Sequence, residues 1–75
     1  MSVTLDERGQ RCPMPVIALA RAALAAAPGS LIVVISDDPG SIADIPAWCS
    51  MRGATLEGVD VLEDGARAFR VRTAS

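Results

Sequence analysis

The stretch of this sequence most able to do chemistry is RCPMP, residues 11–15, where one cysteine stands between an arginine and two prolines. If Cys12 caps a helix that begins at Pro13, both prolines occupy first-turn positions whose N–H groups have no acceptor within the helix. The N–H of Met14 is then free to meet the Cys12 sulfur, and Arg11 and the helix dipole favour negative charge there. We therefore expect the pKa of the Cys12 thiol to fall toward neutrality.

A thiolate at the start of a helix is a nucleophile and can also carry sulfur. In a Cys-x-x-Cys motif a second thiol resolves a mixed disulfide, but here Pro15 occupies that position. The pattern therefore favours a group carried on Cys12, with Arg11 and Met14 stabilising the anion and Pro13 and Pro15 fixing its geometry. The simpler alternative is that Cys12 is a small hydrophobic residue packed before a helix.

Composition limits the other chemistry that the chain can perform. The 75 residues contain no histidine and two cysteines, which excludes a four-ligand zinc site and a Ser-His or Cys-His couple within the chain. We find no set of carboxylates placed for hydrolysis or proton transfer, and we expect no metal and no cofactor. Two cysteines without the dense pattern of small secreted domains indicate reduced thiols in the cytoplasm.

Charge and hydropathy argue against nucleic acid and membranes as partners. The formal charge is -2, the pI is near 4.8, and like charges form no run. The apolar segment 13–29 is similar to a signal peptide, but Asp6 and Glu7 precede it and Arg21 interrupts it. It is also too short to span a membrane.

The elements that must position the cysteine follow from periodicity. The length predicts one domain over residues 1–75. Residues 2–9 alternate as a short strand closed by Gly9, and a helix follows from Pro13 to the Pro28-Gly29 stop. On a helical wheel its core face comprises six apolar residues: Val16, Ile17, Ala20, Ala23, Leu24 and Ala27.

The middle of the chain predicts a buried strand and a second helix. Residues 30–36 are a continuous apolar run typical of a central strand. Asp44 is a plausible N-cap of the next helix, with Pro46 in its first turn and Gly53 as its C-cap. Two of its residues, Ile45 and Cys49, point inward, with Ile42 as a further candidate. Cys49 is thus expected to be buried and inert, and Trp48 to lie at the rim of the core.

The last third predicts two strands, 55–63 and 66–73, joined through Asp64-Gly65, with a bulge at Gly58. In the last strand two residues face the core, Phe69 and Val71, and two face solvent, Arg70 and Arg72. The order β-α-β-α-β-β predicts an α/β fold of the α+β kind. It is a two-layer sandwich with both helices on one face of a four-stranded mixed sheet, and its open face carries an apolar strip.

Two blocks of this sequence are similar to a known family. LDERGQRCPMPV resembles the N-terminal signature of the TusA/SirA family of small sulfur-carrier proteins in six positions: Leu5, Asp6, Gly9, Cys12, Pro13 and Pro15. SDDPGSIADIPAWCSMRGATL resembles the middle signature in eight: Asp37, Asp38, Pro39, Asp44, Ile45, Pro46, Trp48 and Cys49. The resemblance covers nearly the whole chain.

The resemblance implies a two-layer sandwich and a cytoplasmic protein whose motif cysteine, Cys12, carries sulfane sulfur as a persulfide. It implies a cysteine desulfurase or a rhodanese-like protein as the sulfur donor and a downstream sulfur-acceptor protein, for example in tRNA thiolation. Members are also tied to sulfur oxidation, molybdenum cofactor assembly and selenium handling. The protein would be a carrier and co-substrate with sulfurtransferase character rather than an autonomous enzyme.

Two other hypotheses compete with the persulfide carrier. In the first, the chain is a non-catalytic regulatory or interaction module that binds a partner through the open sheet face, with Cys12 as a redox-sensitive thiol. In the second, the two-layer fold binds RNA directly, which the acidic pI and the scarce aromatic residues disfavour.

Overall fold

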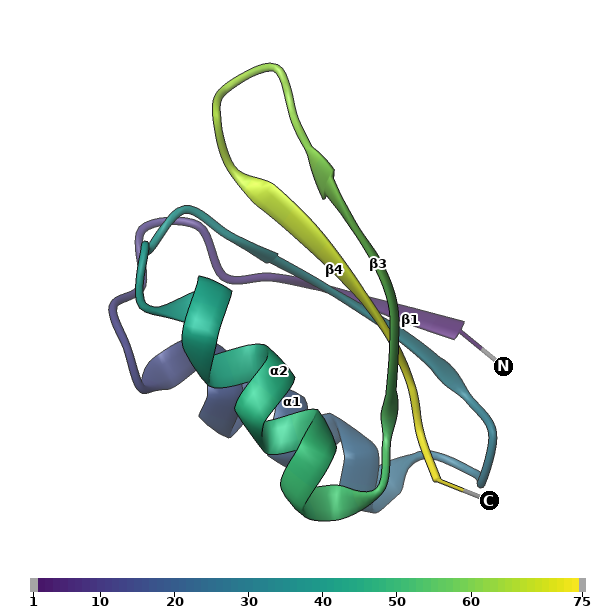
Figure 1. The fold of residues 1–75 in the computed structure, drawn as a ribbon. Coiled ribbons are helices and arrows are strands. Elements are labelled where there is room, and N and C mark those ends of the chain that lie inside the picture. The colour runs from purple at the N-terminus through teal and green to yellow at the C-terminus, as the bar shows by residue number, and fades with distance from the viewer. Residues whose placement is uncertain (1, 75) are drawn as a thin grey trace.

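The computed structural model describes residues 2–74 and has the predicted order of elements (Figure 1). They are β1 (Ser2–Asp6), α1 (Met14–Ala25), β2 (Leu31–Ser36), α2 (Ser41–Arg52), β3 (Thr55–Val61) and β4 (Arg67–Arg72). The strand order in the sheet is β1-β2-β4-β3; β1 pairs parallel with β2, and β4 runs antiparallel to both of its neighbours. Both helices lie on one face, so the predicted two-layer sandwich is confirmed.

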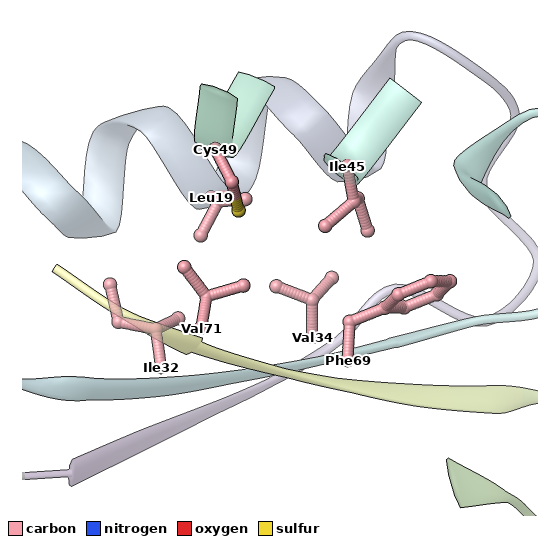
Figure 2. Close-up of a cluster of buried hydrophobic side chains, with 7 residues drawn as sticks. All are labelled: Leu19, Ile32, Val34, Ile45, Cys49, Phe69 and Val71. Carbon is pink, nitrogen blue, oxygen red and sulfur yellow. The ribbon is translucent and has the colours of Figure 1, made fainter. Parts of the chain in front are cut away.

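The core lies between the helices and the two central strands. Alternate residues of β2 are fully buried because one face of the strand meets the helices. Figure 2 shows the four sheet residues pointing toward the three helix residues of the cluster: Ile32, Val34, Phe69 and Val71 below, and Leu19, Ile45 and Cys49 above. The predicted burial of Ile45, Cys49, Phe69 and Val71 is confirmed.

The buried face of α1 differs from the prediction. Leu24 was expected in the core, but it is 90% exposed, and the helix buries Pro15 and Leu19 instead. Val16 and Ala23, which were predicted to face inward, do pack against the core. The helix is apolar nearly all round, with Arg21 as its one charged residue, so hydrophobic periodicity alone does not fix which face meets the sheet.

The start of α2 also differs from the prediction. The helix begins at Ser41 after Gly40, so Asp44 is not its N-cap and Pro46 lies inside it. The chain turns straight into the helix because the Ser41 N–H donates to the Asp38 carbonyl at 3.1 Å, and the two buried hydroxyls of Ser36 and Ser41 lie 2.7 Å apart. A proline at position 46 removes one helical hydrogen bond, to the carbonyl four residues earlier.

The far end of α2 matches the prediction. Gly53 ends the helix in the left-handed region at a φ of 69°, where glycine meets no steric penalty. Trp48 is partly buried and packs against the core, as expected for a residue at its rim. Ile42, the further candidate for the core, is 46% exposed.

The two strands of the β3–β4 hairpin are shorter than predicted, but the bulge and the face on which Arg70 and Arg72 lie are as predicted. The register shifts between Leu56 and Gly58, which confirms the bulge. On the open face Arg70 pairs with Asp60, and Arg72 pairs with Glu57 at 3.1 Å. A Cβ at residue 58 would overlap the Arg70 guanidinium, so glycine makes room for that ion pair.

The open face of the sheet carries the expected apolar strip. Its members alternate with the buried residues of β2 and are half-buried: Leu31, Val33 and Ile35. In the register of the sheet, Leu31 lies opposite Arg72 and Val33 opposite Arg70. The two arginines therefore flank the strip along its length.

Two leucines of α1 give a matched test of this packing. Leu19→Ala should lower the free energy of unfolding by about 2–5 kcal/mol, because it removes a buried side chain and leaves a cavity. Leu24→Ala should change it by less than about 0.5 kcal/mol, because that side chain is exposed. Urea denaturation followed by circular dichroism measures both. Equal losses of unfolding free energy in the two variants would contradict the observed orientation of α1, in which Leu19 faces the sheet and Leu24 faces solvent.

Candidate functional site

Cys12 lies in the loop between β1 and α1, beside the loop between β2 and α2. Because β1 and β2 are parallel, the segments that follow them emerge at the same edge of the sheet, as Figure 1 shows. The Gly9 N–H donates to the Asp37 carboxylate at 3.0 and 3.2 Å, and the Cys12 N–H donates to Asp38 Oδ2 at 3.0 Å. Two adjacent aspartates therefore hold the backbone of the cysteine loop.

The Cys12 thiol is exposed and donates a hydrogen bond to Asp44 Oδ2, from the first turn of α2. This hydrogen bond is the main cause of a raised pKa of the Cys12 thiol, followed by desolvation and by the negative charges of Asp44 and Asp38. A nearby carboxylate disfavours the thiolate because two like charges would then adjoin. The predicted fall of this pKa toward neutrality is therefore wrong in sign.

The start of α1 is built differently from the predicted cap. The residue before the helix is Pro13, joined to Cys12 by a cis peptide bond, and the helix begins at Met14. The Met14 N–H donates to the Arg11 carbonyl at 2.8 Å, so it is not the donor to the Cys12 sulfur that the sequence predicted. Pro15 is fully buried, so this end of the helix is anchored in the interior.

Gly40 lies directly against the cysteine. A Cβ at this position would be 2.9 Å from Asp38 Oδ2 and 3.1 Å from the Cys12 Cβ, so a side chain here would displace the Asp38 carboxylate and crowd Cys12. Sequence reasoning did not assign Gly40, Asp37, Asp38 or Asp44 to the site. The signals available were the acidic DDPG segment after a central strand and the resemblance of the middle block, which includes Asp37, Asp38 and Asp44 but was not connected to the cysteine.

A shallow groove begins at the thiol and runs between the two helices. It has a volume of about 380 Å³ and, Asp44 apart, it is lined by Cys12 and apolar residues: Pro13, Val16, Ala47, Trp48 and Met51. Met51 is 80% exposed at its edge. The groove gives an incoming sulfur compound or protein side chain an apolar surface next to the Cys12 thiol.

The second cysteine does not belong to this site. Cys49 is buried in the core, and burial raises the pKa of its thiol. Residues 2–74 bring no three histidine, cysteine or acidic side chains together in a way suited to a metal ion. Neither helix in this range has the length and apolar character needed to cross a membrane.

The fold and the site define a small two-layer α+β protein whose one exposed thiol precedes its first helix. The chain belongs to the TusA sulfurtransferase family, because the family model described as Sulfurtransferase TusA matches residues 3–73. The family implies a sulfur-carrier or sulfurtransferase role and partners in sulfur relay. The fold is similar to that of the SirA-like protein from Desulfitobacterium hafniense, with a TM-score of 0.86 and 23% identity over 97% of this chain and 99% of that chain.

The two thiols should differ in reactivity with iodoacetamide. Only Cys12 should be alkylated in the folded protein, because Cys49 is buried. The alkylation rate of Cys12 should keep increasing with pH beyond the ordinary thiol pKa, because the reaction needs the thiolate and the contact with Asp44 disfavours the thiolate. Mass spectrometry over a pH series measures the profile. Cys12→Ser should remain unmodified until denaturant exposes Cys49. A profile with its midpoint below the ordinary thiol value would contradict the structure.

Gly40→Ala should disturb the Cys12 loop. The added methyl group overlaps the Asp38 carboxylate, which should move and release the Cys12 N–H. Amide hydrogen exchange at Cys12, followed by NMR, should then become faster, because its acceptor is lost. Ser50→Ala, a change at an exposed position of α2, serves as the control. Unchanged exchange at Cys12 in Gly40→Ala would show that the loop accommodates the methyl group.

Proposed function

We propose that this protein accepts sulfane sulfur as a persulfide on Cys12 and relays it to a downstream acceptor protein. The observation that carries the proposal is the exposed Cys12 thiol at the end of an apolar groove, in a member of the TusA sulfurtransferase family. The other cysteine is buried, so Cys12 has no accessible neighbour that would discharge it as an internal disulfide.

In the first half of the relay, the Cys12 sulfur attacks the outer sulfur of a donor persulfide, R–S–SH. The donor S–S bond breaks, Cys12–S–SH forms, and the donor departs as a thiol once it has received a proton. In the second half an acceptor thiol attacks the same outer sulfur and gives up its proton, and Cys12 is the leaving group, which takes up a proton in turn. Each half exchanges one S–S bond for another, so neither consumes an oxidant or a reductant.

The surroundings of Cys12 supply the remaining roles. Arg11 precedes Cys12 and is assigned to stabilise the anion during transfer, Pro13 and Pro15 are assigned to fix the approach to the helix, and Met14 begins that helix. The donor is a cysteine desulfurase or a rhodanese-like protein, and the acceptor belongs to tRNA thiolation or another branch of sulfur metabolism. The relay operates in the cytoplasm, without a cofactor and without direct contact to nucleic acid or membrane.

The regulatory module with Cys12 as a redox switch fits the site less well. Redox-sensing cysteines are low-pKa thiols next to a resolving cysteine, whereas the pKa of Cys12 is raised and Cys49 is buried. The apolar strip of the open face is flanked by the Arg70–Asp60 and Arg72–Glu57 ion pairs. Neither feature favours this alternative.

Intact mass spectrometry tests the carrier. After incubation with a cysteine desulfurase and cysteine, the wild-type protein should gain about 32 Da, one sulfur atom, and lose it on reduction. Cys12→Ser should gain nothing, whereas Cys49→Ser should behave as the wild type if it folds. No gain with this donor, followed by none with a rhodanese-type donor, would count against the carrier and favour the interaction module.

A further inference from the structure

We propose that Asp44 is the catalytic proton acceptor of Cys12, taking the thiol proton as sulfur arrives and returning it to the departing thiolate. This inference rests on the proposed function and adds to it the residue that moves the proton. It also departs from the expectation from the sequence that the chain has no arrangement for proton transfer.

The geometry selects Asp44 among the carboxylates around the site. Asp37 accepts the Gly9 N–H and Asp38 accepts the Cys12 N–H, so both are engaged with the backbone of the loop. Asp44 alone of the three has its carboxylate on the Cys12 sulfur, the reacting atom. The sequence contains no histidine that could serve instead.

The position of Asp44 is fixed by the core. It directly precedes Ile45, which is fully buried, and its own side chain is half-buried beside the groove. The other charged group near the sulfur is Asp38 from the β2–α2 loop, whereas Asp37 of the same loop accepts the Gly9 N–H and Arg11 precedes Cys12 in the chain. Because the buried Ile45 fixes the adjoining backbone, the Asp44 carboxylate stays in contact with the sulfur and needs no reorganisation during the reaction.

The proton balance of the relay uses one carboxylate. As the Cys12 sulfur forms a bond to the outer sulfur of R–S–SH, its proton passes to Asp44 Oδ2. The bond between the two donor sulfurs breaks, and the electron pair leaves on R–S⁻. Asp44 then returns the proton to give R–SH. On delivery the acceptor thiol gives its proton to Asp44 as its sulfur bonds to the outer sulfur. The S–S bond of Cys12–S–SH breaks and Asp44 protonates the departing Cys12 thiolate, so Asp44 is again a carboxylate after each half and no external acid or base is consumed.

A carboxylate next to a thiol has two opposed effects. Its negative charge disfavours a free thiolate, which is the species that alkylating agents require. Its lone pair accepts the proton while the new S–S bond forms, which sulfur transfer requires. Removing the charge without changing the shape should therefore raise the rate of alkylation and lower the rate of sulfur acceptance. A merely structural role would not move the two rates in opposite directions.

The experiment compares these two reactions in four proteins. The wild type, Asp44→Asn, Asp44→Glu and the control Asp60→Asn, whose carboxylate pairs with Arg70 on the opposite face of the sheet, are each treated with glutathione persulfide. A small donor makes the rate independent of protein docking. Quenched intact mass spectra give the rate of sulfur gain, and iodoacetamide over a pH series gives the midpoint of thiol ionisation. Circular dichroism confirms the fold.

Asp44→Asn should accept sulfur about a hundredfold more slowly than the wild type, although its alkylation midpoint moves to lower pH. Asp44→Glu should recover part of the rate, and Asp60→Asn should match the wild type in both reactions. Sulfur gain by Asp44→Asn at the wild-type rate or faster would overturn the assignment, because Asp44 would then only restrain the thiol. A wild type that gains no sulfur would instead overturn the proposed function, and this inference with it.

Discussion

The parallel pairing of β1 with β2 is the constraint on which the site depends. It places Asp6 beside Ile35, and the pairing continues one residue further, where the Glu7 N–H donates to the Ile35 carbonyl at 2.8 Å. The chain must leave both strands at the same edge, so residues 26 positions apart meet there as donor and acceptor. An antiparallel pairing would send the two loops to opposite ends and leave the cysteine without its aspartates.

The core and the site share their anchors. Pro15, at the start of α1, and Ile45, beside Asp44 in α2, are both fully buried, so α1 is fixed near Cys12 and α2 is fixed near Asp44. In a domain this small, little separates the hydrophobic core from the surface. A substitution that loosens either anchor therefore alters the contact between Cys12 and Asp44 as well as the stability of the fold.

The sequence predicts the fold well and the site only in part. Local signals were enough for the strand alternation at Phe69 and Val71, the C-cap at Gly53 and the burial of Cys49. The face of α1 was missed because nearly all of its residues are apolar, so that its orientation depends on the sheet beneath it. Nothing local marks Pro15 and Leu19 as the buried pair.

The sign of the thiol pKa was missed for a related reason. The residues next to Cys12 in sequence, Arg11 and the start of the helix, both favour the anion. The residues next to it in space, Asp38 and Asp44, come 26 and 32 positions later and carry the opposite charge. Electrostatics at short range is decided by spatial neighbours, which single-sequence reasoning does not supply.

Trp48 gives this protein a built-in optical reporter. It is the only tryptophan of the chain, which has no tyrosine, so the intrinsic fluorescence excited at long wavelength comes from one indole. That indole lines the groove beside Cys12 and also a second hollow, on the side of Leu24 and Arg52, and its ring nitrogen is buried without a hydrogen-bond partner among residues 2–74. Emission from Trp48 is therefore sensitive to whatever occupies the groove, and it can be followed in real time on the unlabelled protein.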